Sequence, residues 1–353
     1  MRIAVQAPAF VFADQSRNFN GYNFQFLKAY KPLIYLPRPW HYFRYRKAFS
    51  RQGLDPGEYH FILRERSLRA QADVVVCFNG MAHVAENAPP RHFAGLKVWH
   101  VMDYSFFAGH HHAALEAGHV DYVMAYGRLD HYCGFFRKYY PRFIGRVVDV
   151  PFGYAPRFHC RVPVTGRKRK CIALGAINPV EADVPANDRL HDWFSYFAGR
   201  SAWSHTLRRF VVENEEALAP VIDSMLPHFP TRDNPDYDAP TVLNAYAMFL
   251  NDESIANFPP ARTYEGVAAG SIMVARDRPL FADLGFIHGE NCLLLPEVSV
   301  PALRDTLGRF LADDNLLGSL QQNGLQFIQR YSHANVAAAL FRRLNELYDA
   351  HNR

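Results

Sequence analysis

The stretch Pro259–Gly270 reads Pro-Pro-Ala-Arg-Thr-Tyr-Glu-Gly-Val-Ala-Ala-Gly, and the apolar run Ser271–Ala275 follows it directly. Two prolines favour an extended approach to a short helix, and the run Ile272–Ala275 predicts a buried strand after that helix. The free amides and the dipole at a helix N-terminus attract anions. Glu265, in the first turns, can accept hydrogen bonds from the two hydroxyls of a ribose, although a carboxylate there also stabilises the helix dipole alone. Together these features suit a nucleotide diphosphate.

Short apolar runs alternate with helical patterns in the N-terminal half of the chain. Strands are expected at Arg2–Ala7, Asp73–Phe78, Lys97–Met102, Asp121–Tyr126 and Val147–Pro151. Helices are expected at Asn23–Tyr30, Phe61–Gln71 and Asp130–Tyr140, whereas the aromatic and basic stretch Pro37–Gly57 shows no clean period. Because strands that alternate with helices form parallel sheets, this half predicts a doubly wound α/β domain.

The hundred residues around and after Glu265 present a fixed order of motifs. Asp277-Arg278-Pro279 is followed by Leu280–Phe286, by Gly289–Leu295 and by amphipathic helices around Val300–Asp313, Leu316–Tyr331 and Ala334–His351. This order resembles the C-terminal half of GT-B glycosyltransferases. It is most similar to the family-4-like and spore-maturation-type branch, where the pattern R-x-x-E-x-x-A-x-G is typical. The pattern is matched here by Arg262, Glu265, Ala268 and Gly270.

The resemblance covers residues 240–350 well and the rest of the chain in the order of its elements. It implies an α/β GT-B fold, in which two Rossmann-like parallel-sheet domains face each other across a cleft. Val150–Phe158 resembles the joint before the interdomain linker, and Arg161–Lys170, with five basic residues, fits a solvated linker. We therefore expect an acceptor-binding domain over 1–160 and a nucleotide-sugar domain over 161–353, with the last helix packing back on the first domain.

The resemblance also implies which residues bind the donor. Glu265 would hold the ribose, and the backbone at the helix start would hold the phosphates with Arg262. The first strand of the second domain, Cys171–Ile177, ends where ligands of such sheets bind. Arg208 offers a planar fork for phosphate, although it is equally plausible as a surface charge. The full set of expected donor contacts is Glu265, Arg262, Thr263, Tyr264, Pro260, Asn257, Gly175, Asn178 and Arg208.

The N-terminal half is expected to hold the acceptor. His100 and Asp103 stand at the end of a predicted strand, where catalytic groups gather in such sheets. An Asp at this place can act as a general base or orient a hydroxyl, and it can also be an ordinary turn or capping residue. Asn79-Gly80 and His83 form a similar point after the strand that ends at Phe78.

One position departs from the family pattern. Retaining family-4-like enzymes carry two Glu residues eight positions apart, the first beside the donor sugar and the second on the ribose. Glu265 matches the second, and Asn257 stands eight positions before it. An amide therefore replaces the first carboxylate, as in many spore-maturation-type relatives, and this leaves the donor and the retaining stereochemistry open.

The composition limits the classes of partner. A chain of 353 residues, 49% of them hydrophobic, can form two domains with sizeable cores. The net charge of +5 is mild for this length, so no nucleic-acid partner is expected. Such a charge fits a site for a diphosphate or a face near anionic lipid. The stretch Trp40–Gly57 could touch an anionic acceptor or a membrane, or could be ordinary solvated surface.

The expected location is cytoplasmic or at the inner face of the membrane. No apolar run reaches the ~18–20 residues of a membrane span, and the start of the chain lacks the pattern of a signal peptide. The five cysteines form no C-x-x-C pair, which is typical of a reducing compartment.

Neither a metal nor another cofactor is expected, and the nucleotide-sugar serves as donor substrate. His110-His111-His112 would point in different directions on a helix, so the three cannot easily share an ion. Asp236-Tyr237-Asp238 has the spacing of a metal-dependent glycosyltransferase motif but lies in a Pro-rich loop. The sequence contains no G-x-G-x-x-G, no P-loop and no G-x-S-x-G elbow, which argues against dinucleotide enzymes, P-loop kinases and esterases.

The function implied by the resemblance is glycosyl transfer with retention, from a nucleotide-sugar to a glycan, lipid-linked or polysaccharide acceptor in cell-envelope assembly. Two alternatives stay open. One is a nucleotide-sugar epimerase or a phosphorylase on the same fold. The other is a catalytically silent nucleotide or glycan binder, which Asn257 favours most.

Overall fold

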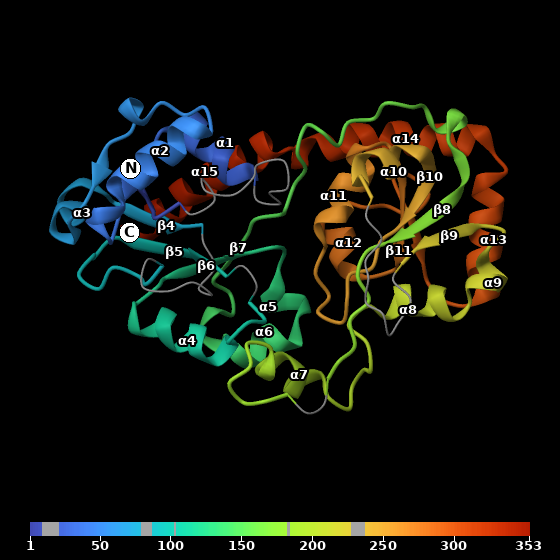
Figure 1. Cartoon of the computed structure of the whole chain (residues 1–353), viewed down its shortest axis with the longest axis horizontal. Coiled ribbons are helices and arrows are strands. Elements are labelled where there is room, and N and C mark those ends of the chain that lie inside the picture. The colour runs from blue at the N-terminus through green and yellow to red at the C-terminus, as the bar shows by residue number, and fades with distance from the viewer. Residues whose placement is uncertain (9–20, 79–86, 102–103, 182–183, 227–236) are drawn as a thin grey trace. The chain divides into compact units, whose positions relative to one another are not determined.

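The computed structural model describes residues 1–8, 21–78, 87–101, 104–181, 184–226 and 237–353 (Figure 1). These residues divide into two compact units. Unit 1 comprises Met1–Pro151, Asp183–Tyr196 and His333–Arg353, and unit 2 comprises Phe152–Ala182 and Phe197–Ser332. The boundary predicted near residue 160 therefore falls inside unit 2, and the last helix belongs to unit 1. Each unit is built on one parallel sheet.

Unit 1 holds a seven-stranded parallel sheet in the order β3-β2-β1-β4-β5-β6-β7. The strands are β1 (Ile3–Gln6), β2 (Leu33–Tyr35), β3 (Phe61–Ile62), β4 (Val74–Cys77), β5 (Leu96–His100), β6 (Tyr122–Ala125) and β7 (Val147–Asp149). Strand β4 reads Val-Val-Val-Cys and is buried throughout, as a strand covered on both faces requires. The order 3-2-1-4-5-6 is that of a Rossmann sheet, whose direction of winding reverses between β1 and β4.

Helices cover both faces of this sheet (Figure 1). They are α1 (Gly21–Tyr30), α2 (Tyr42–Arg51), α3 (Glu65–Gln71), α4 (Ala108–Ala117), α5 (Leu129–Tyr132), α6 (Gly134–Tyr139) and α15 (His333–His351), with α7 (His191–Phe197) at the unit boundary and short 3-10 turns η3 (Pro39–His41), η4 (Pro56–Glu58) and η5 (Pro141–Phe143). Helix α15 buries Val336, Leu340 and Leu344 at helical spacing beside α1, and the rings of Tyr30 and Phe341 stack 4.0 Å apart. The last helix thus completes the core of unit 1.

Unit 2 holds a five-stranded parallel sheet in the order β12-β11-β10-β8-β9. Its strands are β8 (Lys168–Leu174), β9 (Ile222–Met225), β10 (Tyr246–Leu250), β11 (Ile272–Arg276) and β12 (Leu293–Leu295). Its helices are α8 (Thr206–Glu213), α9 (Glu215–Leu218), α10 (Ala239–Ala245), α11 (Ala261–Ala268), α12 (Pro279–Asp283), α13 (Val300–Leu311) and α14 (Asp314–Ile328), with 3-10 turns η6 (Val164–Gly166) and η7 (Gln329–Tyr331). Counted along the chain, this is the 2-1-3-4-5 order, whose reversal lies between β8 and β10.

Helix α11 lies close to the sheet because residue 266 is glycine. A Cβ on Gly266 would stand only 2.4 Å from the ring of Phe249 in β10. Residues 263 to 268 of α11 are all buried, and the strand predicted after the helix is β11. The stretch Pro259–Ala275, called the decisive stretch below, therefore forms the helix and strand that its sequence predicts.

Two local predictions were wrong or incomplete. The first residues of the predicted helix Phe61–Gln71 form the edge strand β3, and the helix begins only at Glu65. The stretch Pro37–Gly57, which shows no clean period, contains the ten-residue helix α2. Among the helices of the described residues, none combines the length and hydropathy that a membrane crossing demands.

Candidate functional site

The candidate site lies at the carboxyl edge of the unit 2 sheet, where the winding reverses between β8 and β10. Ligands of open α/β sheets bind at this place because the loops from the two strands diverge there. The segment Gly175-Ala176 leaves β8, and Asn251-Asp252-Glu253 leaves β10. Helices α8 and α11 begin nearby and contribute their first turns.

Gly175 makes room for a buried arginine. Its φ of +109° lies in a region that suits glycine, and a Cβ would stand 2.9 Å from Nη1 of Arg208. That Nη1 donates to the Ala176 carbonyl over 2.9 Å. The guanidinium of Arg208 is therefore held against the turn that follows β8.

Asp252 anchors the start of α8 to the end of β10. One carboxylate oxygen accepts the backbone N–H of Arg208, in the first turn of α8, over 3.0 Å. The other accepts the N–H of Ser254, also over 3.0 Å. An acid from a neighbouring loop thus caps the helix, as a side chain at its own N-cap would do. The N-cap residue itself is His205, whose pKa is lowered to about 4 by burial and by the charge of Arg208, so its ring is neutral.

Arg208 is a buried cation with an unused donor. It is 6% exposed, and its Nε has no hydrogen-bond partner among the described residues. Burial lowers its pKa to about 10, and the charge of Arg262 acts in the same direction, whereas Asp252 opposes the shift. A guanidinium that stays charged at neutral pH, with an unsatisfied donor at a strand end, is suited to an anionic ligand.

Glu253 arranges two further arginines. Its carboxylate accepts from Nε of Arg278 over 3.1 Å, and Nη1 of Arg276 lies 3.9 Å from the same oxygen. Nη2 of Arg276 donates to the hydroxyl of Thr206 in α8 over 2.6 Å. Burial, followed by the neighbouring charge of Asp252, raises the pKa of Glu253. Its second oxygen, Oε2, is buried with no partner in the part of the chain that the structure describes.

The first turn of α11 is fixed to β10. Pro260 is the N-cap residue, and its carbonyl accepts the N–H of Thr263 over 2.9 Å. The hydroxyl of Thr263 in turn accepts from Nδ2 of Asn251 over 3.0 Å. Arg262 donates from Nη1 to the hydroxyl of Tyr237 over 3.2 Å. The amides at the start of this helix are thereby held at the same edge as Gly175 and Arg208.

Glu265 is a buried carboxylate that lacks a donor. It is 7% exposed, and no described residue gives its carboxylate a hydrogen bond. Burial raises its pKa, while the positive charges of Arg262 and Arg157 act to lower it. Buried charged groups are ordinarily paired or hydrogen-bonded. Glu265 is therefore prepared to accept hydrogen bonds from a ligand.

Three other predicted donor contacts are placed differently. Tyr264 is fully buried and packs its ring 5.0 Å from that of Tyr331. Asn178 is exposed, and its carbonyl accepts the N–H of Ser204 over 2.8 Å. Asn257 has a left-handed φ of +52° and is half-buried. The ligand roles given to these residues, and to the others at the edge, stay predictions.

The sequence interpretation missed Asn251, Asp252 and Glu253, which connect the site. All three are at most 1% exposed. A signal was present, because three polar residues come directly after the apolar run Ala247–Leu250. Polar groups at that position belong to the carboxyl edge of a parallel sheet.

In unit 1, His100 is the last residue of β5 and is fully buried. Its Nδ1 lies 3.3 Å from the Phe78 carbonyl and 3.5 Å from the hydroxyl of Tyr22, and the ring of Tyr126 is 4.7 Å away. Burial lowers the pKa of His100 to about 4, so the ring is neutral at physiological pH. Asp103, Asn79, Gly80 and His83 lie outside the described residues.

Within the described ranges, no group of three His, Cys, Asp or Glu side chains is arranged to hold a metal ion. In the Asp236-Tyr237-Asp238 segment, Asp236 lies outside those ranges, and Asp238 accepts the N–H of Thr241 and so caps α10.

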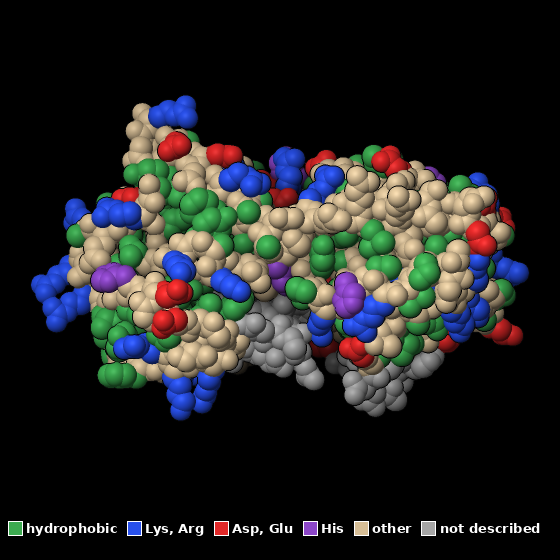
Figure 2. All heavy atoms as spheres, turned by 90° about the horizontal axis from the view of Figure 1, so that it is seen from above, with side chains coloured by type: hydrophobic (Ala, Val, Ile, Leu, Met, Phe, Trp, Pro, Cys, Tyr) green, Lys and Arg blue, Asp and Glu red, His purple; other side chains and the backbone are tan. Residues whose placement is uncertain are grey.

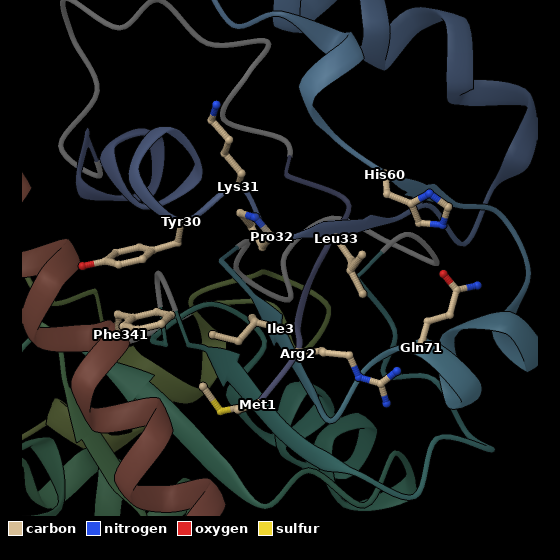
Figure 3. Close-up of a pocket in the computed structure, with 10 residues that line it drawn as sticks. All are labelled: Met1, Arg2, Ile3, Tyr30, Lys31, Pro32, Leu33, His60, Gln71 and Phe341. Atoms are coloured by element: carbon tan, nitrogen blue, oxygen red, sulfur yellow. The ribbon is translucent and has the colours of Figure 1, made fainter.

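A separate cavity of about 510 Å³ lies at the amino ends of β1 and β2 in unit 1 (Figure 3). Two charged side chains that line this cavity already form ion pairs, Arg2 with Asp73 over 2.9 Å and Lys31 with Glu58 over 2.8 Å. This edge is opposite to the one where ligands of such sheets bind, and we assign it no role.

Comparison with known proteins adds the fold family. No family model matches the chain, and no curated protein is similar to it in sequence. Among solved structures, Anabaena HepE in complex with UDP and glucose has a TM-score of 0.57 at 12% identity, covering 98% of this chain and 99% of that one. Sucrose-phosphate synthase from Thermosynechococcus elongatus has a TM-score of 0.54 at 12% identity, covering 99% of this chain and 100% of the other. A glycosyltransferase from Rickettsia africae has a TM-score of 0.51 at 12% identity, covering 99% and 98%. The two Rossmann-like domains thus form a GT-B fold, which confirms the predicted fold class.

Proposed function

We propose that this chain is a glycosyltransferase that takes its sugar from a nucleotide-sugar bound at the carboxyl edge of the unit 2 sheet. Two observations together support this most strongly. Glu265 is a buried carboxylate to which no described residue donates a hydrogen bond, and Arg208 is a buried cation whose Nε has no hydrogen-bond partner among the described residues. A nucleoside diphosphate supplies hydroxyls for the first and an anion for the second. The fold is shared with HepE, which has been solved with UDP, with UDP and glucose, and with UDP-glucose.

Glu265 would grip the ribose of the donor. Its carboxylate has four lone-pair positions and none is used by the described residues, so two vicinal hydroxyls can both donate to it. Burial raises the pKa of Glu265, and the positive charges of Arg262 and Arg157 oppose that rise. A hydroxyl pair would complete the hydrogen bonding that the folded chain leaves unmade.

The diphosphate would lie over Gly175, Arg208 and the start of α11. In glycosyl transfer, the acceptor oxygen forms a bond to the anomeric carbon while the bond from that carbon to the diphosphate oxygen breaks. The nucleoside diphosphate leaves with the electron pair, and the acceptor hydroxyl gives up its proton. Arg208 and the helix amides would stabilise the charge that develops on the leaving group, without need of a metal.

The acceptor would be bound by residues of unit 1. The pKa of His100 is lowered to about 4 by burial, and its ring lies against the rings of Tyr22 and Tyr126 and the backbone carbonyl of Phe78. We therefore treat His100 as a positioning residue and keep Asp103 as the proposed general base. A glycan or lipid-linked acceptor in envelope assembly, a hexosyl donor, and a location in the cytoplasm or at the inner membrane face complete the proposal.

Retention of configuration is part of the proposal, with the amide of Asn257 beside the donor sugar. The same Asn257 favours a second candidate, a protein that binds a nucleotide-sugar without turning it over. Turnover of the donor in the presence of an acceptor distinguishes the two.

A thermal-shift screen of UDP, GDP, ADP, CDP and their sugars tests the donor site. A ligand at a hundred times its Kd stabilises by about 2.7 kcal/mol, which moves the melting point by several degrees. We expect nucleotides of one base to raise the melting point of the wild type but not that of Arg208→Gln. Arg200 is an exposed arginine of the same unit, and Arg200→Gln should behave as wild type. Absence of stabilisation by every nucleotide would refute the proposal.

A further inference from the structure

Two large aromatic side chains protrude from unit 1 at the start of α2. Trp40 is 72% exposed and Phe43 is 78% exposed, whereas the remaining large hydrophobic residues of the described chain reach 52% at most. Arg44, Lys47 and Arg51 are exposed on the same helix. We call these five residues the aromatic–basic face.

The face points outward because the opposite side of α2 is held in the core. Tyr45, Ala48 and Phe49 are buried, and the ring of Phe49 packs 4.8 Å from Tyr59 and 5.6 Å from Phe61. On a helix, positions four apart share one side. Phe43, Lys47 and Arg51 therefore form one outward row, with Arg44 beside it and Trp40 in the preceding turn η3.

The segment that carries this face contains basic residues and no acidic ones. The sequence from Gln15 to Leu54 contains neither Asp nor Glu. The nearest acids along the chain have other partners, since Asp55 accepts the N–H of Gly57 and Glu58 pairs with Lys31. Figure 2 shows hydrophobic side chains with Lys and Arg side chains beside them on the surface that unit 1 forms. A surface of this kind is complementary to an anionic one.

The combination of exposed aromatic and basic side chains favours a bilayer over other anions. Exposed Trp and Phe side chains enter the interfacial layer of a membrane, where the indole ring is favoured, while Lys and Arg remain at the level of the phosphates. Nucleic acid that stacks on aromatic rings is instead bound along a basic groove. Neither Trp40 nor Phe43 lines the cavity of about 510 Å³ in unit 1.

We propose that the aromatic–basic face docks this protein onto bilayers that contain anionic phospholipid. Trp40 and Phe43 enter the interface, and Arg44, Lys47 and Arg51 attract the lipid headgroups. The inference deepens the membrane-face location in the proposed function, and its test is separable from glycosyl transfer because docking is measured without donor or acceptor. It would also bring the enzyme to a lipid-linked acceptor.

The first test is co-sedimentation with vesicles of equal parts phosphatidylcholine and phosphatidylglycerol, compared with pure phosphatidylcholine. We expect sedimentation with the anionic vesicles only, and a loss of this binding as salt is added. Each basic side chain near an anionic surface contributes about fivefold to partitioning, so Arg44→Gln/Lys47→Gln/Arg51→Gln should weaken binding about 100-fold. The matched variant Arg304→Gln/Arg309→Gln/Arg342→Gln, which removes three exposed charges elsewhere, should bind as wild type.

The second test uses the intrinsic fluorescence of Trp40. Of the four tryptophans, Trp99 is fully buried, Trp193 is 9% exposed, Trp203 is half-buried under Arg209, and Trp40 is 72% exposed. Anionic vesicles should therefore shift the emission to the blue through Trp40, and brominated lipid should quench it. Trp40→Phe should remove the shift but keep most of the binding, whereas Trp40→Ala/Phe43→Ala should lower the binding at least tenfold.

Far-UV circular dichroism and the thermal transition verify that each variant is folded. The proposal is overturned if the wild type does not sediment with anionic vesicles. It is equally overturned if the charge variant binds as wild type. Loss of binding in the charge variant alone, with Trp40→Ala/Phe43→Ala unaffected and a short single-stranded DNA bound as tightly as the vesicles, would identify a general polyanion surface and also overturn it.

Discussion

Replacing Glu265 with glutamine should weaken donor binding while leaving the protein at least as stable. The substitution keeps the shape of the side chain and removes its charge. A hydrogen bond to a charged group contributes about 1.5–3 kcal/mol. Loss of that charge at one ribose hydroxyl should therefore raise the Kd about 10- to 100-fold, at roughly 1.4 kcal/mol per tenfold.

The stability of the unliganded protein should respond in the opposite way. Glu265 is buried, its pKa is raised by that burial, and no described residue donates to its carboxylate. Removing a buried charge that accepts no hydrogen bond from a described residue should leave the free energy of unfolding unchanged or raise it by about 1 kcal/mol. A structural glutamate would show the reverse, namely lower stability and unchanged affinity.

Isothermal titration calorimetry with the nucleoside diphosphate found in the screen measures the Kd, and urea unfolding measures the stability. Glu216→Gln, at an exposed position in α9, is the matched control and should match the wild type in both. The reasoning is refuted if Glu265→Gln binds the nucleotide as tightly as wild type, or if it loses stability while affinity is kept.

Three further predictions concern the same edge of the sheet. Since the pKa of Glu265 is raised, donor affinity should fall as the pH drops through that pKa. The contribution of Glu265 to stability has the opposite pH dependence: it is present at low pH and is lost as the pH rises through the raised pKa. A Kd for the nucleotide that does not change with pH in the acidic range would contradict the predicted loss of affinity. Asp252→Ala should cost about 0.5–2 kcal/mol of stability, because it removes the cap of α8, and should weaken donor binding by releasing Arg208; urea unfolding and calorimetry measure the two effects, and an unchanged Kd would separate Arg208 from the donor. Gly175→Ala should cost about 1–3 kcal/mol through its positive φ and should displace the guanidinium of Arg208; wild-type affinity in a folded Gly175→Ala protein would show that this contact is not needed.

The decisive stretch could be read from the sequence because its signals are local. Pro259 and Pro260 set the entry to α11, small residues end the helix, and the apolar run that follows can only be buried. The place of Glu265 in that helix follows from the same stretch. The environment of the Glu265 carboxylate does not follow from this stretch, because it depends on side chains from distant segments, such as Arg157.

The connecting residues of the site could not be found in this way. Asp252 acts by capping α8, which lies more than forty positions earlier in the chain, and the two meet only because β8 and β10 are neighbours in the sheet. The order of parallel strands is a tertiary property that no local pattern encodes. The polar run Asn251–Glu253 was visible in the sequence, but its partners were not.

Helix α2 was missed for a different reason. Its buried residues Tyr45, Ala48 and Phe49 have helical spacing, but the exposed Phe43 and Trp40 obscure the apolar period. Exposed aromatic residues break an amphipathic pattern wherever a surface serves for contact. The exposed aromatic residues that obscure the helical period are also the ones that define the aromatic–basic face.

The most direct test of the central claim is a crystal structure of this protein with the nucleoside diphosphate that stabilises it. The account predicts the ribose hydroxyls within hydrogen-bond distance of the Glu265 carboxylate. It also predicts the diphosphate against Arg208 and the first amides of α11. A nucleotide bound elsewhere, with Glu265 and Arg208 still unpartnered, would contradict the assignment of the donor site.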